Sequence, residues 1–443
     1  ESISNVWKIE ELKNRILITL GLLLVFRFGA QVTLPGIDAT QLGNLAGQTK
    51  EGIGSILDMF TGGAFSQASV FALGIMPYIT ASIVVQLMGI AIPYLQKLQS
   101  DGESGRKKIN QITRWLTIGI TLVQGPTYIY NLYRTLPSNA FLLGFNSFEF
   151  LFSSVIILVT GTIFAMWLGE KITDKGIGNG ISLLIMVGIL ARFPQAFIQE
   201  FTTRVTNNNG GPMLLVIEII IWLLVIVCCV LLVMAVRRIP VQYARRTTSG
   251  DFEQDMLNGN RQWIRLKLNA SGVMPIIFAQ AIMFIPAALA GLSKSDTSQS
   301  IVGAFSNMFG FWYNLVFATL IIVFTFFYTA ITVPTNKMSD DLKRSGGFIP
   351  GIRPGVETSD YLDKVMSLIT FPGSLFLALI AVFPAIIVSI MDVQQSWAMF
   401  FGGTSLIIMV GVAIDTMQQI NSYLLNRHYD GLMKSGKNRK AVA

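Results

Sequence analysis

The chain of 443 residues is 52% hydrophobic and only 13% charged, with a formal net charge of +8. Because about a quarter of the residues in an average soluble domain are charged, this composition excludes an ordinary water-soluble fold and indicates a polytopic membrane protein. The single histidine, His428, lies near the C-terminal end, and no G-x-x-x-x-G-K-[ST] motif is present. These two observations exclude P-loop nucleotide hydrolysis and histidine-based metal or nucleophile chemistry within the membrane.

Ten apolar runs of membrane-spanning length follow one another along the chain. A helix needs about 20 apolar residues to cross a bilayer, and hydropathy places the spans at 16–32, 71–92, 112–130, 151–168, 181–197, 214–236, 274–292, 312–333, 368–390 and 405–423. The fifth run is the least regular, because Arg192 and Pro194 interrupt it. The first run exceeds the apolar core of a signal peptide, so we expect it to be retained.

Basic residues predict the orientation of these spans. Most of the 33 Lys and Arg residues lie at the N-terminus, in the loops after spans 2, 4, 6 and 8, and in the tail. Cytoplasmic segments carry such an excess, so both termini are predicted to be cytoplasmic. We divide the chain into an amphipathic N-terminus (1–15), an N-terminal half (16–200), a C-terminal half (201–425) and a tail (426–443).

The stretch 55–70, before the second span, is too short to cross a bilayer. It carries Asp58, the Gly62-Gly63 pair and Ser66, and is predicted to be a re-entrant half-helix. Non-helical backbone at membrane depth is tolerated only where it is buried in protein or lines a wet cavity. The stretch therefore predicts a pore or a transport path.

Polar residues inside the spans are few. Arg27 is expected to snorkel or to pair locally rather than to contact a substrate. The adjacent Cys228 and Cys229 point apart on a helix and are interpreted as small core residues. Glu218 and Asp415 are the only acidic residues within spans, whereas an ion-coupled transporter usually has several embedded charges. Neither carboxylate is given a role.

A glycine-rich loop at 170–182 precedes the fifth span. Gly176, Gly178 and Gly180 form G-x-G-x-G, which is not the dinucleotide-binding pattern. We favour a tight turn in which Asn179 caps the following helix, with a direct role toward substrate as the alternative.

Two cytoplasmic loops are rich in basic residues. The loop 237–267 contains two arginine doublets, which suit either a solvated, orientation-setting face or a phosphate backbone or acidic protein groove. The loop 335–364 contains SGGFIPGIRPG, whose glycines and prolines predict a stiff protrusion that presents Arg353.

Isoleucines at spacing four occur in two glycine-broken spans. Ile75 and Ile79 share one face of the second span, and Ile181 and Ile185 share one face of the fifth. Their β-branched side chains are stiff, so a ring of them would seal a constriction by dewetting. On their own, such pairs are ordinary core or lipid-facing residues.

Six motifs in series resemble the SecY family, whose members form the channel of the bacterial Sec protein translocase. They read GGAFSQASVFALGIMPYITASIVVQLM, GESGRKKI, MWLGEKITDKGIGNGIS, FYTAI, SGGFIPGIRPG and FGGTSLIIMV, and the resemblance runs from the first span to the tail. The resemblance implies an all-α protein of ten transmembrane helices in two pseudo-symmetric halves, spans 1–5 and 6–10, around an hourglass pore. Unfolded secretory proteins would cross it, and membrane segments would leave laterally.

The resemblance also implies roles for individual residues. The stretch 55–70 would be the plug, with its blocking residues Ser55, Ile56, Leu57, Asp58, Met59, Phe60, Thr61, Gly62, Gly63, Ala64 and Phe65. The pore ring would be Ile75, Ile79, Ile181, Ile185, Ile277 and Ile408. A lateral gate between spans 2 and 3 and spans 7 and 8 would be held by Gln86, Asn179 and Asn269. Docking of a motor or ribosome would use Arg237, Arg238, Arg245, Arg246, Lys343, Arg344 and Arg353. The stretch 251–263 is more acidic than the family's usual basic run.

The implied partners are those of a passive channel in the bacterial cytoplasmic membrane. They are the SecE and SecG subunits, the SecA motor or a translating ribosome, a signal sequence with its unfolded preprotein, membrane lipids, and SecDF and YidC. No cofactor, direct nucleotide or enzymatic activity is implied. The alternatives are a secondary transporter of a small solute, which also uses broken helices, and a membrane scaffold without a pore.

Overall fold

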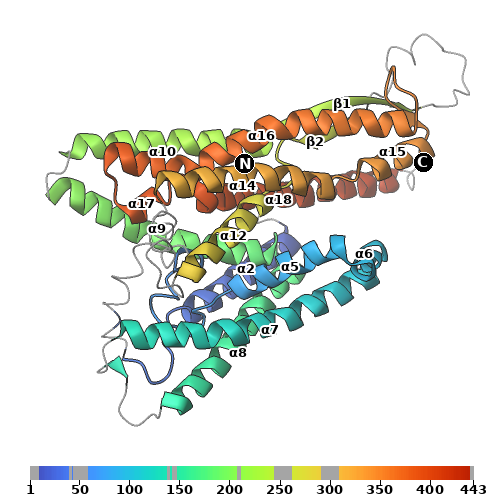
Figure 1. The fold of residues 1–443 in the computed structure, drawn as a ribbon. Coiled ribbons are helices and arrows are strands. Elements are labelled where there is room, and N and C mark those ends of the chain that lie inside the picture. Colours follow the sequence, from blue (N-terminus) through green and yellow to red (C-terminus); the bar gives the residue numbers. More distant parts are fainter. Residues whose placement is uncertain are drawn as a thin grey trace, which may run out of the picture. The chain divides into compact units, whose positions relative to one another are not determined.

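The computed structural model describes residues 9–38, 42, 58–136, 140–141, 147–206, 211–243, 262–290 and 309–439. Helices dominate it (Figure 1). The chain divides into two compact units. Unit 1 comprises Glu1–Pro212, Val393–Phe400 and Gly411–Ala443, and unit 2 comprises Met213–Asp392 and Phe401–Val410. The plug residues Ser55, Ile56 and Leu57 lie outside the described residues.

A helix overlaps each of the ten predicted spans, although the first helix ends three residues before its predicted span does and the second begins five residues after the predicted start. These helices are α2 (Glu10–Gly29), α5 (Met76–Ala91), α7 (Gly102–Thr135), α8 (Ser147–Lys175), α9 (Gly180–Thr206), α10 (Gly211–Met234), α12 (Met274–Ala290), α14 (Phe311–Thr332), α16 (Val356–Met391) and α18 (Gly403–Arg439). Within the described residues, six helices are long and apolar enough to cross a membrane, or seven if the bent pair of α5 and α6 (Pro93–Ser100) is one span. The protein is therefore a multi-pass membrane protein.

Several helices extend beyond their apolar runs. Helix α9 continues through Arg192 and Pro194 to Thr206, although both residues interrupt the apolar pattern. Helix α16 begins with the polar turns VETSDYLDK, twelve residues before the predicted span. Backbone hydrogen bonds inside a helix do not depend on the surrounding solvent, so a helix need not end where its apolar run ends.

Unit 2 contains a three-stranded sheet that the all-α prediction does not include. Its strands are β1 (Val236–Tyr243), β2 (Gln262–Lys267) and β3 (Gly347–Phe348), in the order β2-β1-β3 and antiparallel. The sheet joins the two predicted cytoplasmic loops into one structure, together with the short helix α15 (Thr335–Arg344). One face packs on an apolar cluster of Ile239, Val241, Leu266, Leu342, Ile349, Leu362 and Met366.

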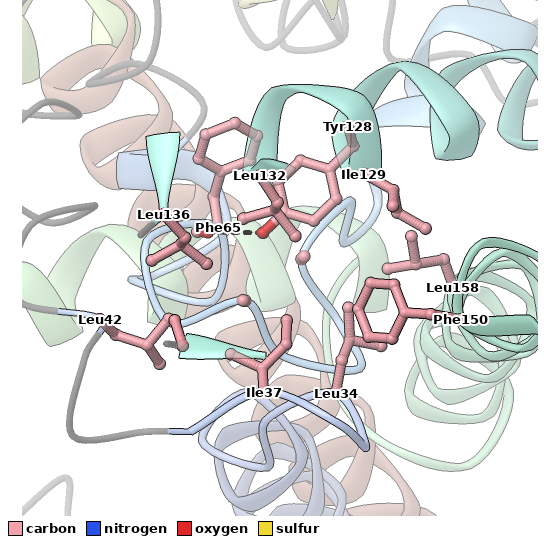
Figure 2. Close-up of a cluster of buried hydrophobic side chains, with 13 residues drawn as sticks. Leu34, Ile37, Leu42, Phe65, Tyr128, Ile129, Leu132, Leu136, Phe150 and Leu158 are labelled. Atoms are coloured by element: carbon pink, nitrogen blue, oxygen red, sulfur yellow. Dashed lines mark hydrogen bonds between the residues drawn. The ribbon is translucent and has the colours of Figure 1, made fainter. Parts of the chain in front are cut away.

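In unit 1, α7 lies beside α8 and α5 (Figure 1). Figure 2 shows the cluster of buried side chains at one end of this group. Ile129 and Leu132 of α7 and Leu158 of α8 pack there against Leu34 and Phe65. Because Phe65 belongs to the predicted plug, part of that segment is a component of the unit's hydrophobic core.

Candidate functional site

The residues 58–75, which we call the turn segment, lead into α5 with little helix of their own. Only Asp58, Met59 and Phe60 are helical, and turns follow up to residue 75 except at the bridge residue Ser69. Of the predicted half-helix, the described residues 58–70 therefore contain only this one helical turn. The physical reason is the backbone at Gly62 and Gly63, whose φ angles of 65° and 95° lie in the left-handed region that reverses the chain.

The carboxylate and the carbonyl of Asp58 close this reversal. The amide of Ser66 donates to Asp58 Oδ1 at 2.8 Å, and the amide of Gly63 donates to the Asp58 carbonyl at 2.8 Å. Asp58 therefore satisfies backbone donors that have no helix to satisfy them.

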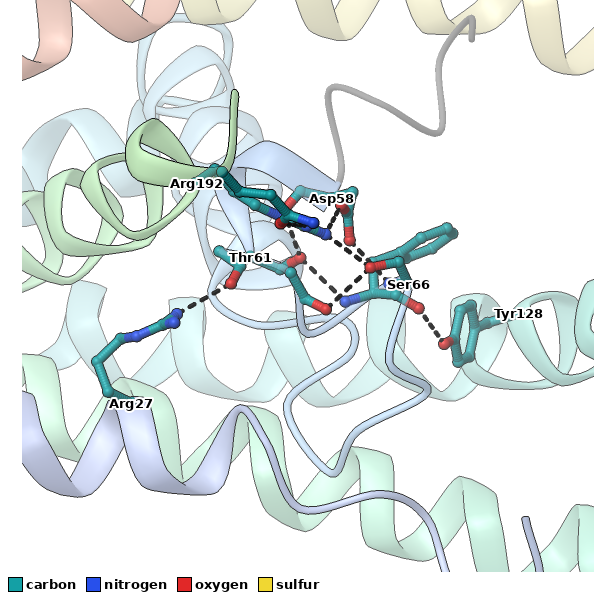
Figure 3. Close-up of polar contacts among 10 residues, drawn as sticks. Arg27, Asp58, Thr61, Ser66, Tyr128 and Arg192 are labelled. Atoms are coloured by element: carbon teal, nitrogen blue, oxygen red, sulfur yellow. Dashed lines mark hydrogen bonds and ion pairs between the residues drawn. The ribbon is translucent and has the colours of Figure 1, made fainter. Parts of the chain in front are cut away.

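Two arginines from different helices hold the turn segment (Figure 3). Arg192 of α9 forms an ion pair with Asp58 and donates through Nη2 to Ser66 Oγ at 2.6 Å. Arg27 of α2 donates through Nη1 to the carbonyl of Gly62 at 2.9 Å. Arg27 thus pairs within the protein, as the sequence analysis favoured. The Asp58 and Arg192 side chains are only 12% and 23% exposed.

The backbone of the turn segment also touches α9 directly. A Cβ at Gly188 would lie 2.8 Å from the carbonyl oxygen of Phe60, and a Cβ at Gly62 would lie 2.8 Å from Cα of Gly188. Only glycine at position 188 permits this approach. On the side of α7, the Tyr128 hydroxyl donates to the Phe65 carbonyl at 2.8 Å.

The C-terminal part of the turn segment is anchored by other means. The amide of Val70 donates to the Val32 carbonyl at 2.9 Å, and the Ala68 carbonyl accepts from Leu34 at 2.8 Å. The ring of Phe71 stacks between Phe26 of α2 and Phe164 of α8, at centroid distances of 5.6 and 6.0 Å.

The predicted ring isoleucines lie at the beginnings of four helices. In unit 1, Ile75 is the N-cap of α5, Ile79 donates its amide to the Ile75 carbonyl at 3.0 Å, and Ile181 and Ile185 occupy the first two turns of α9. In unit 2, Ile277 lies in the first turn of α12, and Ile408 lies near the start of α18. Ile75, Ile185 and Ile408 are buried, and the other three are partly exposed.

The three predicted gate residues each have a partner within their own unit. Asn179 Oδ1 accepts from the amides of Ile181 at 3.2 Å and Ser182 at 3.5 Å, which confirms the predicted helix cap. Gln86 donates to Ser82 Oγ at 3.2 Å. Asn269 accepts from Ser271 Oγ at 3.3 Å.

The glycine-rich loop before α9 lies between two helices of unit 1. The Gly176 carbonyl accepts from Arg15 of α2 at 3.3 Å, and the Gly178 amide donates to Gln419 of α18 at 2.8 Å. Gly178 has φ of 82°, and a Cβ at Gly180 would overlap the backbone carbonyl of Gly169. The loop is a tight structural turn, as its sequence favoured.

Changing Gly180 to alanine is expected to destabilise the protein by about 1–3 kcal/mol or more, because backbone has to move to admit the new Cβ. Gly21→Ala in α2 is the matched control, since nothing lies within 4 Å of its added Cβ. That control should gain about 0.5–1 kcal/mol from helix propensity. Thermal unfolding in detergent measures both changes. Equal effects of the two substitutions would contradict this packing.

The basic side chains of the two loops are exposed on unit 2. Arg237 and Arg238 are exposed on β1, and Arg238 lies directly opposite Arg265 of β2. Lys343 and Arg344 are exposed in the last turn of α15. Arg245 and Arg246 lie outside the described residues, as does most of the acidic stretch 251–263.

Arg353 lies at the tip of the predicted protrusion. Its side chain is 88% exposed, with one oxygen of Glu357 3.9 Å away. The hydroxyl of Thr358 donates to the Arg353 carbonyl at 2.8 Å, and that of Ser339 donates to the Gly355 carbonyl at 2.6 Å. These bonds fix the backbone of the tip while the Arg353 side chain remains largely exposed.

Comparison with known families decides the family. The model of a family described as SecY matches residues 69–417 of the chain. The chain belongs to the SecY family. The protein translocase subunit SecY of Thermotoga maritima is 39% identical over 99% of both chains. The SecY subunit of Haemophilus influenzae is 40% identical over 96% of this chain and 94% of its own.

Solved structures agree with the fold of this SecY-family chain. One is a SecY structure described as showing that the plug domain stabilises the closed state of the translocation channel and maintains a membrane seal. It has a TM-score of 0.60 at 17% identity and covers 93% of this chain and 92% of that one. The Sec61 chain of a canine ribosome-channel complex has a TM-score of 0.55 at 16% identity, with the same coverage.

Two acidic residues of this SecY-family chain have no role that the structure explains. Glu218 is fully buried in α10, and Asp415 is exposed on α18. Within the described residues, no group of three or more His, Cys, Asp or Glu side chains is placed to hold a metal ion.

Proposed function

We propose that this SecY-family chain is the protein-conducting channel of a translocase, through which unfolded secretory proteins cross the membrane and from which transmembrane segments leave laterally. The observation that carries the proposal is the turn segment, a compact non-helical insert held against α2, α7 and α9 at the start of a predicted span. Such backbone needs a protein or aqueous surrounding at membrane depth. The chain is not an enzyme, because the SecY family forms channels.

We assign residues 58–70 of the turn segment, the described part of the predicted plug, to the plug of the resting channel and the six isoleucines to its constriction. A translocating chain has arbitrary chemistry, so fixed polar contacts cannot line the narrowest point. Stiff apolar side chains seal by dewetting and part without leaving unpaired polar groups. The placement of these isoleucines in the first turns of their helices supports the proposal.

The lateral gate would open between α5 and α7 on one side and α12 and α14 on the other. Gln86, Asn179 and Asn269 would bias it toward the closed form. Hydrogen bonds between membrane helices contribute about 0.6 kcal/mol on average, so a hydrophobic signal sequence would be sufficient to displace them.

The exposed basic residues of unit 2 would dock the driving partner. Arg237, Arg238, Lys343, Arg344 and Arg353 suit ribosomal RNA or an acidic groove of a motor such as SecA. The canine relative in complex with a ribosome supports this assignment. SecE and SecG would complete the channel, and SecDF and YidC would associate with it. We place the protein in the bacterial cytoplasmic membrane with both termini in the cytoplasm, following its basic loops.

The transporter alternative is not supported. The relatives that match nearly the full chain are translocase subunits, and the spans contain only two acidic residues.

Translocation tests the proposal directly. The chain, reconstituted with its partner subunits and motor, is expected to carry a secretory precursor into vesicles, measured as protection from added protease. A precursor that remains fully accessible, together with saturable uptake of a small solute, would overturn it.

A further inference from the structure

The ion pair between Asp58 and Arg192 joins residues 134 positions apart. Arg192 lies in a membrane-spanning helix, where a charged side chain is energetically unfavourable unless it is paired. The Arg192 guanidinium lies over Gly63, because a Cβ added there would be 3.0 Å from Arg192 Cζ. From that position it contacts both Asp58 and Ser66, the two residues that close the chain reversal. One side chain of α9 thus grips both ends of the turn.

The two parts of the turn segment are attached in different ways. Its C-terminal part is fixed by backbone hydrogen bonds to residues 32 and 34 and by the stacked ring of Phe71. Its N-terminal part, residues 58–66, meets α9 through the Arg192 side chain and the Gly188 backbone approach. Side-chain contacts of this kind break without unfolding either element, whereas the anchored end has to stay in place.

One donor of the Arg192 guanidinium, Nε, is buried and has no hydrogen-bond partner among the described residues. A buried unsatisfied donor is unfavourable. Both Arg27 and Arg192 contact the Gly62-Gly63 turn, so Asp58 supplies the negative charge that allows two guanidinium groups there. The charge balance between these two arginines therefore depends on the Asp58 carboxylate.

We propose that Asp58 and Arg192 form a latch that positions the turn segment in its closed state, and that release of this pair sets the threshold for opening. Arg192 is a positioning residue, acting through the turn segment rather than on the translocating chain. The inference rests on the proposed function, since it assigns the regulation of the same segment.

The test uses the intact chain, reconstituted with its partner subunits, and the variants Asp58→Asn, Arg192→Gln and Ser66→Ala. Losing a charge-assisted contact is expected to raise the resting ion leak about tenfold or more for the two charge variants, and less for Ser66→Ala. The same variants should translocate a precursor with a weakened signal sequence that the unchanged protein rejects. The double variant Asp58→Asn/Arg192→Gln should leak no more than the worse single variant. Either single substitution already breaks the ion pair, so the second substitution has no further contact to remove.

Arg114→Gln is the matched control. It removes an arginine from another ion pair of unit 1, which joins Arg114 of α7 to Glu170 of α8. Because this pair includes no residue of the turn segment, the variant should leave the leak unchanged. Charge variants that leak no more than Arg114→Gln, in preparations that still translocate a normal precursor, would overturn the latch. Purely additive leak in the double variant would also overturn it. Failure of the unchanged protein to translocate any precursor would instead refute the proposed function.

Discussion

Asparagine at Ile79 or Ile277 is expected to raise the resting ion conductance of reconstituted vesicles by about tenfold or more. An amide side chain binds water where isoleucine repels it, and a barrier lowered by about 1.4 kcal/mol gives a tenfold faster passage. These two positions are the best choice because both side chains are partly exposed. Ile75 and Ile185 are buried, so polar substitutions there combine a change in the seal with a loss of packing.

Leu87→Asn is the control for this conductance. Leu87 also lies on α5 and its side chain is 36% exposed. It differs from Ile79 in that it does not belong to the predicted pore ring. Asparagine there should leave the conductance unchanged. If Ile79→Asn and Ile277→Asn conduct no better than Leu87→Asn, the isoleucines do not line the constriction.

Replacing Trp397 with alanine is expected to destabilise the protein by about 3–5 kcal/mol, the usual cost of removing a large buried aromatic side chain. Trp397 is 2% exposed in the connection between α16 and α18. Its ring lies 5.5 Å from that of Phe193 and 5.4 Å from that of Phe197, both on α9. The aromatic cluster therefore attaches this connection to α9.

A buried ion pair supports the same attachment. Glu200 and Arg204 of α9 are 1% and 4% exposed and 2.7 Å apart, and Glu200 Oε2 accepts from the Gln394 amide at 3.0 Å. Unfolding in detergent measures the loss in Trp397→Ala, with Trp115→Ala as the control, because Trp115 is 68% exposed. A loss below about 1 kcal/mol in Trp397→Ala would show that the connection is held by other contacts.

The positions of the membrane helices were predictable because each apolar run is long, even where a single charged residue or proline interrupts it. The ends of the helices were not predictable from the apolar runs. Residues 198–206 of α9 are too polar to read as a span, yet the Glu200 and Arg204 pair at spacing four is a signal that a helix continues there. The cap at Asn179 was predictable for the opposite reason, because capping is local.

The sheet of unit 2 was not predictable from local sequence. β1 contains Pro240 and two adjacent arginines, neither typical of a strand. Its partners begin 19 residues after its end, at Gln262, and more than 100 residues after it, at Gly347. Pairing across such distances is decided by the apolar cluster beneath the sheet rather than by strand propensity.

In the candidate site, the sequence identified the turn segment and missed what holds it. The Gly62-Gly63 pair and Asp58 stand out in an apolar region, so an irregular insert was predictable. Arg192 was read only as an interruption of the fifth span. Its ion pair with Asp58 depends on how α9 packs on the turn segment, a contact that no spacing in the chain encodes.

The most direct test of the closed plug is a disulfide between Phe60→Cys and Ile185→Cys, with Cys228 and Cys229 changed to alanine. The Phe60 carbonyl lies beside Gly188, which is three residues from Ile185 and on the same face of α9. The account predicts that the pair oxidises at rest, that translocation of a secretory precursor then stops, and that reduction restores it. A disulfide that forms while translocation continues unchanged would contradict the account.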